Sequence, residues 1–143
     1  MRLLSGLALV LALGACDTTA ELAEVDVRDL SQDPAALVGT WEWEGSTYFY
    51  TVSGEPVAQT PASTDSTETL AFRTDGFVEI VQRGEVAAVE AYEIRRLAYG
   101  NGTESDTPHL FVGGRPTPFG VDGRRLYIDD RAVDGPLSQY RKR

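Results

Sequence analysis

Hydrophobic and polar residues alternate along much of the chain after residue 37. Trp41 and Trp43 alternate with Glu42 and Glu44, which puts both indoles on one face of a strand and both carboxylates on the other. Further short apolar stretches follow, separated by turn residues. Together they predict eight strands, at about 40–50, 67–73, 77–83, 85–97, 110–112, 119–121, 126–128 and 137–141.

The turns between these stretches favour antiparallel pairing. Asp75-Gly76 and Asp122-Gly123 each stand between two apolar runs, which is the strongest short signal for a hairpin. Residues 51–66 are rich in Ser, Thr and Pro and predict a long loop that is either a lid or without fixed structure. The expected fold is an all-β, small, antiparallel up-and-down barrel of about eight strands, because closure removes exposed edges. A two-layer sandwich is the alternative.

The N-terminus has the anatomy of a signal peptide. Arg2 precedes an apolar stretch over 3–13, and the small residues Gly14 and Ala15 lead into Cys16. The stretch is too short to cross a bilayer of about 30 Å as a helix. Cys16 is the only cysteine, so no disulfide within the chain can use it.

The last four residues of this segment, Leu13-Gly14-Ala15-Cys16, resemble the lipobox of bacterial lipoproteins. The resemblance implies cleavage before Cys16 and fatty acylation there, for example with palmitate, and two or more acyl chains anchor a protein stably. The expected location is the bacterial cell envelope, with the folded domain outside the cytoplasm. Asp17 resembles an inner-membrane retention signal, but the choice of membrane stays open. The alternatives are an ordinary secretory signal and a cytosolic protein with an apolar N-terminus.

Three parts of the chain follow from this interpretation. Residues 1–15 are the lipoprotein signal peptide, 16–36 the lipidated cysteine and a flexible, polar tether, and 37–143 the barrel domain. A short helical turn is expected at the end of the tether, with Ser31 or Asp33 as its N-cap and Pro34 at its first helical position.

Two short motifs of the barrel domain resemble those of lipocalins. Gly39-Thr40-Trp41 is similar to the G-x-W opening of that family, and 140–143 is similar to the aromatic and basic final strand of lipocalin-like lipoproteins. The resemblance implies that Trp41 plugs the closed end of the barrel and that Arg141, or else Arg143, stacks over it as a cation–π partner. The T-D-Y motif of larger lipocalins is missing, and the mature chain of 143 − 15 = 128 residues is short for the family.

The net charge of the chain narrows the classes of partner that are expected. The net charge is −9, and removal of Arg2 with the signal peptide leaves −9 − 1 = −10. Nucleic acids are therefore not expected as partners, because phosphate binding needs a clustered basic surface. An acidic surface favours a hydrated monomer.

Residues typical of catalysis are scarce. His109 is the only histidine, and the serines lack the Gly-x-Ser-x-Gly setting of a nucleophile. Asp129, Asp130 and Asp134 are close in sequence, but their spacing does not match a calcium loop. We therefore expect no enzyme activity, no metal and no cofactor.

Aromatic residues give the one positive indication of binding. Trp43, Phe49, Phe72 and Tyr92 are candidates to point into the barrel and contact a small apolar ligand under the 51–66 loop. A small barrel can instead be filled by its own side chains. In that case we expect an interaction or inhibitor module that binds another envelope protein. The interior volume of the barrel distinguishes ligand binding from the interaction module, because ligand pockets usually exceed about 300 Å³.

Overall fold

A computed structural model describes residues 25–50 and 54–143 of the chain. The predicted signal peptide and the predicted lipidation of Cys16 lie outside the described residues. None of the helices within the described ranges is long and apolar enough to cross a membrane.

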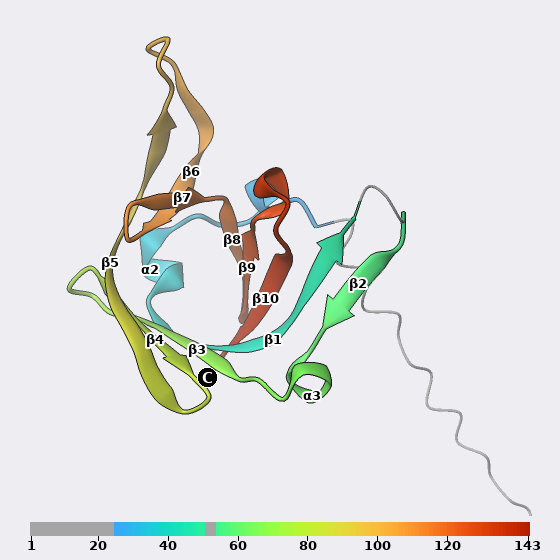
Figure 1. The fold of residues 1–143 in the computed structure, drawn as a ribbon. Coiled ribbons are helices and arrows are strands. Elements are labelled where there is room, and N and C mark those ends of the chain that lie inside the picture. Colours follow the sequence, from blue (N-terminus) through green and yellow to red (C-terminus); the bar gives the residue numbers. More distant parts are fainter. Residues whose placement is uncertain (1–24, 51–53) are drawn as a thin grey trace, which may run out of the picture.

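The described residues form ten antiparallel strands that curl into a nearly closed barrel (Figure 1). The strands are β1 (Gly39–Phe49), β2 (Pro56–Gln59), β3 (Glu68–Phe72), β4 (Phe77–Gln82), β5 (Glu85–Ala98), β6 (Glu104–Val112), β7 (Arg115–Thr117), β8 (Phe119–Asp122), β9 (Arg125–Asp129) and β10 (Leu137–Lys142). Four short helical segments accompany them: η1 (Val27–Asp29), α2 (Pro34–Leu37), α3 (Pro61–Thr64) and η2 (Arg131–Val133). The predicted all-β antiparallel barrel is thus confirmed.

The strands follow one another around the barrel in chain order, apart from β2, which pairs only with β1. The last strand returns to the first, because β10 pairs with β1 from Trp41 opposite Lys142 to Thr47 opposite Leu137. The one interruption lies between β7 and β8, which are joined through Pro118 alone. Proline has no N–H to give to a ladder, so this corner is crossed by the covalent chain rather than by strand pairing.

Two of the tight turns form as predicted. Gly76 and Gly123 both have positive φ, at +84° and +57°, where glycine is favoured. They connect β3 to β4 and β8 to β9, each pair in antiparallel register.

Three predictions about loops and strands were incomplete. The 51–66 segment contains β2 and α3 in addition to the residues 51–53 that are not described. The predicted loop over 99–108 is partly strand, because β6 begins at Glu104, and β5 and β6 form a long hairpin that projects from the barrel (Figure 1). The strand count is ten rather than eight because β2 and β7 are short and carry little alternation.

Much of the predicted tether belongs to the folded body. Val27 is buried at 2% exposure in an apolar cluster with Tyr127 and Leu137. Ser31 forms an isolated bridge with Val121 of β8, with N–O distances of 3.2 and 2.8 Å. The segment over 25–32 thereby covers the β8 edge next to the interruption, which protects unpaired backbone groups.

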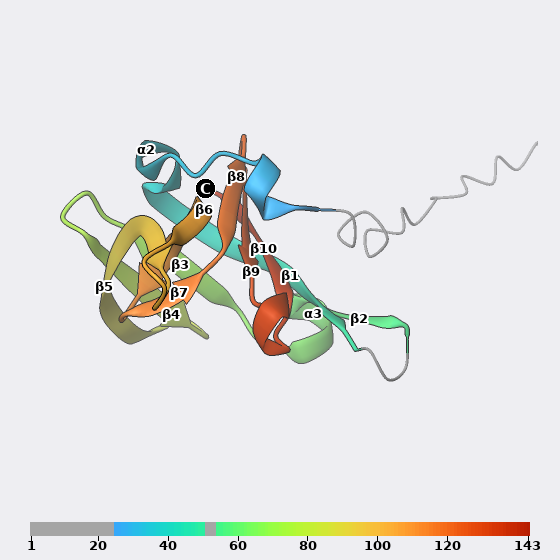
Figure 2. The same cartoon turned by 90° about the horizontal axis from the view of Figure 1, so that it is seen from above.

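One end of the barrel is covered by α2 (Figures 1 and 2). The Asp33 side chain accepts a hydrogen bond from the Ala35 N–H and Pro34 opens the helix, as the sequence predicts. Leu37 and Trp41 are fully buried there, and the Trp41 indole donates to the Leu37 carbonyl at 2.7 Å. The main core thus begins directly beneath α2.

Candidate functional site: a pocket inside the barrel

An apolar pocket of about 210 Å³ lies inside the barrel, and we call it the inner pocket. Its walls come from both sides of the barrel, with β3 and β4 facing β6, β7, β9 and β10. Most of the lining is aliphatic or aromatic because these are the inward positions of alternating strands. The lining residues are Leu70, Phe72, Val78, Ile80, Leu110, Val112, Arg115, Thr117, Ile128, Asp130 and Tyr140.

Four of the eleven lining residues, Arg115, Thr117, Asp130 and Tyr140, carry polar side-chain groups. Arg115 of β7 and Asp130, which follows β9, form an ion pair at 2.6 Å. The Arg115 side chain is mostly exposed, so this pair marks the solvent side of the inner pocket.

A second polar group in the lining is Tyr140. Its hydroxyl donates to Glu68 at 2.6 Å, and Glu68 also accepts from Gln82 at 2.8 Å. Burial, reinforced by the negative charge of Glu68, raises the pKa of Tyr140 well above its usual value. The hydroxyl therefore stays neutral at ordinary pH and is committed to Glu68.

The volume limits what the inner pocket can hold. It is smaller than the 300 Å³ or so of a typical ligand pocket. It is larger than the cavity of about 150 Å³ that binds benzene in an engineered protein core. By proportion, it offers room for about eight non-hydrogen atoms.

Of the four predicted ligand-contacting residues, only Phe72 lines the inner pocket, with 3% of its surface exposed. Tyr92 lies behind it, in an edge-to-face contact at 5.1 Å between ring centroids, and donates its hydroxyl to the Arg73 carbonyl. Trp43 packs against the main core and donates to Ser46.

The fourth candidate, Phe49, belongs to a different apolar cluster. It packs with Val27, Tyr127 and Leu137. Tyr127 neighbours Leu126, which is in the main core, and successive strand residues point to opposite faces of the sheet. Phe49 therefore sits with the outer face of the sheet, away from the inner pocket.

The aromatic plug is present, but its cation differs from the prediction. Lys142, not Arg141 or Arg143, lies over the Trp41 ring, with Nζ 5.0 Å from a ring centroid and 3.2 Å from the Ala36 carbonyl. Arg141 alternates to the other face of β10. There it pairs with Glu44 at 2.6 Å, while Arg143 pairs with Glu42.

Gly39 of the G-x-W motif makes this arrangement possible. A Cβ at Gly39 would lie 2.8 Å from Cε of Lys142, and the backbone there has φ of +133°. The glycine thus leaves the space through which the lysine side chain reaches Trp41.

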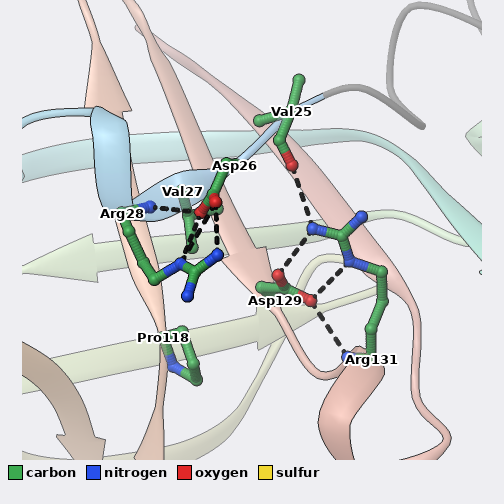
Figure 3. A pocket seen from close by; sticks show the side chains of 7 residues that line it. All are labelled: Val25, Asp26, Val27, Arg28, Pro118, Asp129 and Arg131. Carbon is green, nitrogen blue, oxygen red and sulfur yellow. Dashed lines mark hydrogen bonds and ion pairs between the residues drawn. The ribbon is translucent and has the colours of Figure 1, made fainter. Parts of the chain in front are cut away.

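A second pocket, of about 410 Å³, lies outside the barrel, and we call it the outer pocket (Figure 3). Its lining is the start of the described chain together with the β7–β8 corner and the end of β9. The residues are Val25, Asp26, Val27, Arg28, Pro118, Asp129 and Arg131.

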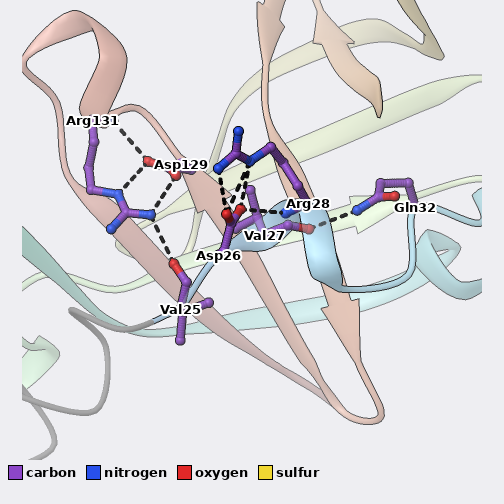
Figure 4. Close-up of polar contacts among 7 residues, drawn as sticks. All are labelled: Val25, Asp26, Val27, Arg28, Gln32, Asp129 and Arg131. Carbon is purple, nitrogen blue, oxygen red and sulfur yellow. Dashed lines mark hydrogen bonds and ion pairs between the residues drawn. The ribbon is translucent and has the colours of Figure 1, made fainter. Parts of the chain in front are cut away.

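Two ion pairs form the charged walls of the outer pocket (Figure 4). Arg28 binds Asp26 through Nε and Nη2, at 2.8 and 2.5 Å. Arg131 binds Asp129 in the same two-pronged manner and also donates to the Val25 carbonyl at 2.9 Å. The hydrogen bonds from Arg28 lower the pKa of Asp26 to about 2, so its carboxylate is charged at neutral pH.

His109, the lone histidine, is held by local contacts in β6. Its Nδ1 lies 3.2 Å from the Thr107 carbonyl and 3.4 Å from the Ser105 hydroxyl. That hydroxyl donates to the Thr107 carbonyl and accepts from the Leu97 N–H. The serine oxygen is therefore occupied by backbone contacts that tie β5 to β6 at a bulge.

Sequence reasoning missed most of both pockets. The inward alternation of Leu70 with Phe72 was a usable signal, and it would have extended to the other aliphatic positions of the lining. The pairing of Arg115 with Asp130 has no such signal in the sequence. The two residues are 15 positions apart, and only the folded barrel brings their side chains together.

Comparison of the chain with protein-family models, with curated proteins and with solved structures found no match. The geometry of the two pockets is therefore the basis for the functional argument.

Proposed function

We propose that this chain is a lipoprotein of the bacterial cell envelope, anchored through Cys16, whose barrel binds a small apolar ligand. The observation that carries the binding proposal is the inner pocket, an apolar space of about 210 Å³ between the two walls of the barrel. The inner pocket is open to solvent beside the Arg115–Asp130 pair, and its apolar walls offer a binding surface to an apolar molecule of matching size.

The size of the inner pocket specifies the ligand further. Molecules of about six to eight non-hydrogen atoms, such as benzene and toluene, should fit, whereas molecules of about twelve or more should not. The expected ligand is a small aromatic or aliphatic molecule, or one short branch of a larger molecule. Larger lipids of the kind bound in wide barrels are not expected.

A size series tests this proposal. Binding of benzene, toluene, naphthalene and biphenyl is measured by NMR chemical-shift changes, and the smaller two should bind while biphenyl should not. Val112→Phe fills the inner pocket and should abolish the binding. Val89→Phe makes the same change at an exposed position of β5 and is the matched control. Equal binding by Val112→Phe and the native chain would contradict the proposal.

The anchor is tested separately. Mass spectrometry of the protein from bacterial membranes should find an N-terminus at Cys16 that carries acyl chains. Cys16→Ser should retain the signal peptide and lose the lipid mass. Cleavage at another position with an unmodified Cys16 would contradict the anchor.

A second candidate function is an interaction module, and the β5–β6 hairpin favours it. This hairpin extends beyond the barrel, and Tyr99 near its tip is half exposed (Figure 1). Exposed aromatic residues on projecting elements are frequent anchors of protein interfaces. Tyr99→Ser should then reduce the crosslinking of the protein to an envelope partner, while ligand binding in the inner pocket remains intact. Unchanged crosslinking would argue against the hairpin as the contact.

A further inference from the structure

The outer pocket offers both signs of charge within one concave surface. The Arg28 side chain is 68% exposed and Asp26 is 39% exposed, while Asp129 and Arg131 are more enclosed. The lining also has an apolar part, because it includes Val27 and Pro118. A ligand complementary to this surface carries an anionic group and a cationic group together.

The two guanidinium groups keep donors for a ligand. The hydrogen bonds of Arg28 and Arg131 to described residues use Nε and Nη2. Among those same residues, the Nη1 nitrogens have no partner, so each guanidinium retains two N–H donors. The two Nη1 nitrogens point away from one another (Figures 3 and 4), so one phosphate can accept from only one guanidinium. Arg28 is the more exposed of the two and can offer a phosphate short charge-assisted bonds.

The carboxylates of the outer pocket can bind the cationic group of such a ligand. Asp26 is the more exposed carboxylate, and its hydrogen bonds with Arg28 keep it ionised. An amine near Asp26 would therefore gain a charge partner while the phosphate binds Arg28. Because the pocket contains two cations and two anions, a simple anion meets no net attraction there.

The chain connects this pocket to the anchoring cysteine. Val25, whose carbonyl holds Arg131, is a lining residue, and eight residues lie between it and Cys16. The nine residue steps from Cys16 to Val25 reach at most about 32 Å when fully extended. If Cys16 is lipidated, the outer pocket cannot be farther than that from the plane of the lipid headgroups.

The overall charge argues for one class of lipid. The chain without its predicted signal peptide has a formal charge of about −10, so an anionic bilayer repels it at short range. A zwitterionic headgroup carries no net charge and avoids this repulsion. We propose that the outer pocket binds the headgroup of a zwitterionic phospholipid, with the phosphate on Arg28 and the amine toward Asp26.

This inference rests on the lipid anchor of the proposed function for its membrane setting, but its test does not use the anchor. The full chain with Cys16→Ser is titrated with glycerophosphoethanolamine, with inorganic phosphate and with ethanolamine, followed by NMR of the arginine side chains. Glycerophosphoethanolamine should bind about tenfold more tightly than either half alone, because only it satisfies both charges. Equal affinity for inorganic phosphate would overturn the zwitterion assignment.

Matched variants locate the binding. Arg28→Gln should weaken glycerophosphoethanolamine binding about tenfold. Arg73→Gln is the control, because Arg73 also pairs with an aspartate two residues away but lies far from the pocket in chain and fold. If the Arg28→Gln variant binds glycerophosphoethanolamine as tightly as the native chain does, the proposal fails.

Vesicles separate the lipid from the free headgroup. The Cys16→Ser chain should sediment more with phosphatidylethanolamine vesicles than with phosphatidylglycerol vesicles, and Arg28→Gln should remove the difference. Equal sedimentation with both lipids would contradict recognition at a membrane. Because this chain lacks the lipid, failure here is distinct from a failure of acylation at Cys16.

Discussion

Gly120 is the position at which a single methyl group should detach the N-terminal segment from the barrel. A Cβ added to Gly120 would lie 2.6 Å from the Val27 carbonyl oxygen and 2.6 Å from Cβ of Leu30. Both contacts are shorter than van der Waals distances, and the Val27 oxygen belongs to the backbone. The Gly120→Ala variant therefore cannot keep the native packing of both segments.

The free-energy cost of Gly120→Ala can be compared with the contacts that hold the N-terminal segment on the barrel. Overpacking of a close contact typically costs about 1–3 kcal/mol. The segment is held to the barrel by the two Ser31–Val121 hydrogen bonds, by the Gln32 side chain on the Phe119 carbonyl, by Arg131 on the Val25 carbonyl and by burial of Val27. Because these contacts join the segment to only one edge of the barrel, the cost should appear as local opening. At about 1.4 kcal/mol per tenfold change, the open population rises between about 5-fold and 150-fold.

Limited proteolysis measures this opening. Trypsin cleavage after Arg28 should accelerate by that factor in Gly120→Ala, since cleavage tracks the open population when reclosing is fast. The control is Gly100→Ala, because a Cβ at Gly100 meets no atom within 4 Å. Unchanged cleavage after Arg28 with unchanged thermal stability would refute the packing argument.

Three further predictions follow from side-chain geometry. Lys142→Gln should lower the free energy of unfolding by about 1–2 kcal/mol through loss of the Trp41 contact, whereas Arg141→Gln should change it by less than about 0.5 kcal/mol, both measured by chemical denaturation. Tyr140 has a raised pKa when folded, so its stabilising effect is complete below about pH 10 and is lost as the unfolded tyrosine ionises above it. Tyr140→Phe should therefore reduce the fall in melting temperature between about pH 9 and pH 11. Asp26 should titrate near pH 2 by NMR, and its stabilising effect should be lost as the pH falls from about 4 towards 2.

The barrel could be predicted because its determinants are local. Alternation fixes the face of each strand, and the Asp-Gly pairs at Gly76 and Gly123 fix two of the hairpins. The short strand β7 escaped prediction because Arg115-Pro116-Thr117 has no apolar alternation. Its strand conformation comes from pairing with β6, which is a tertiary effect.

The predicted tether shows why composition alone misleads. The segment around Val27 is polar and acidic overall, which is typical of flexible linkers. Its docking depends on single residues, namely the apolar Val27 and the backbone of Ser31, and on the absence of a side chain at Gly120. None of these is visible as a periodic pattern. The plug cation was misassigned for a similar reason, because the register of β10 against β1 decides which basic residue faces Trp41.

The two pockets share a wall, and this determines which variants can separate their functions. Asp130 lines the inner pocket, while its neighbours Asp129 and Arg131 line the outer one. A substitution at any of the three shifts the same short segment and disturbs both pockets, so a loss of binding in such a variant would not reveal where a ligand sits. Val112 lines only the inner pocket and Arg28 only the outer pocket. If Val112→Phe removes benzene binding and leaves headgroup binding intact, and Arg28→Gln does the reverse, then the two sites are independent despite their common wall. If both variants stay folded and each loses both ligands, the segment between the pockets couples them, and by linkage each ligand alters the affinity of the other by the same factor.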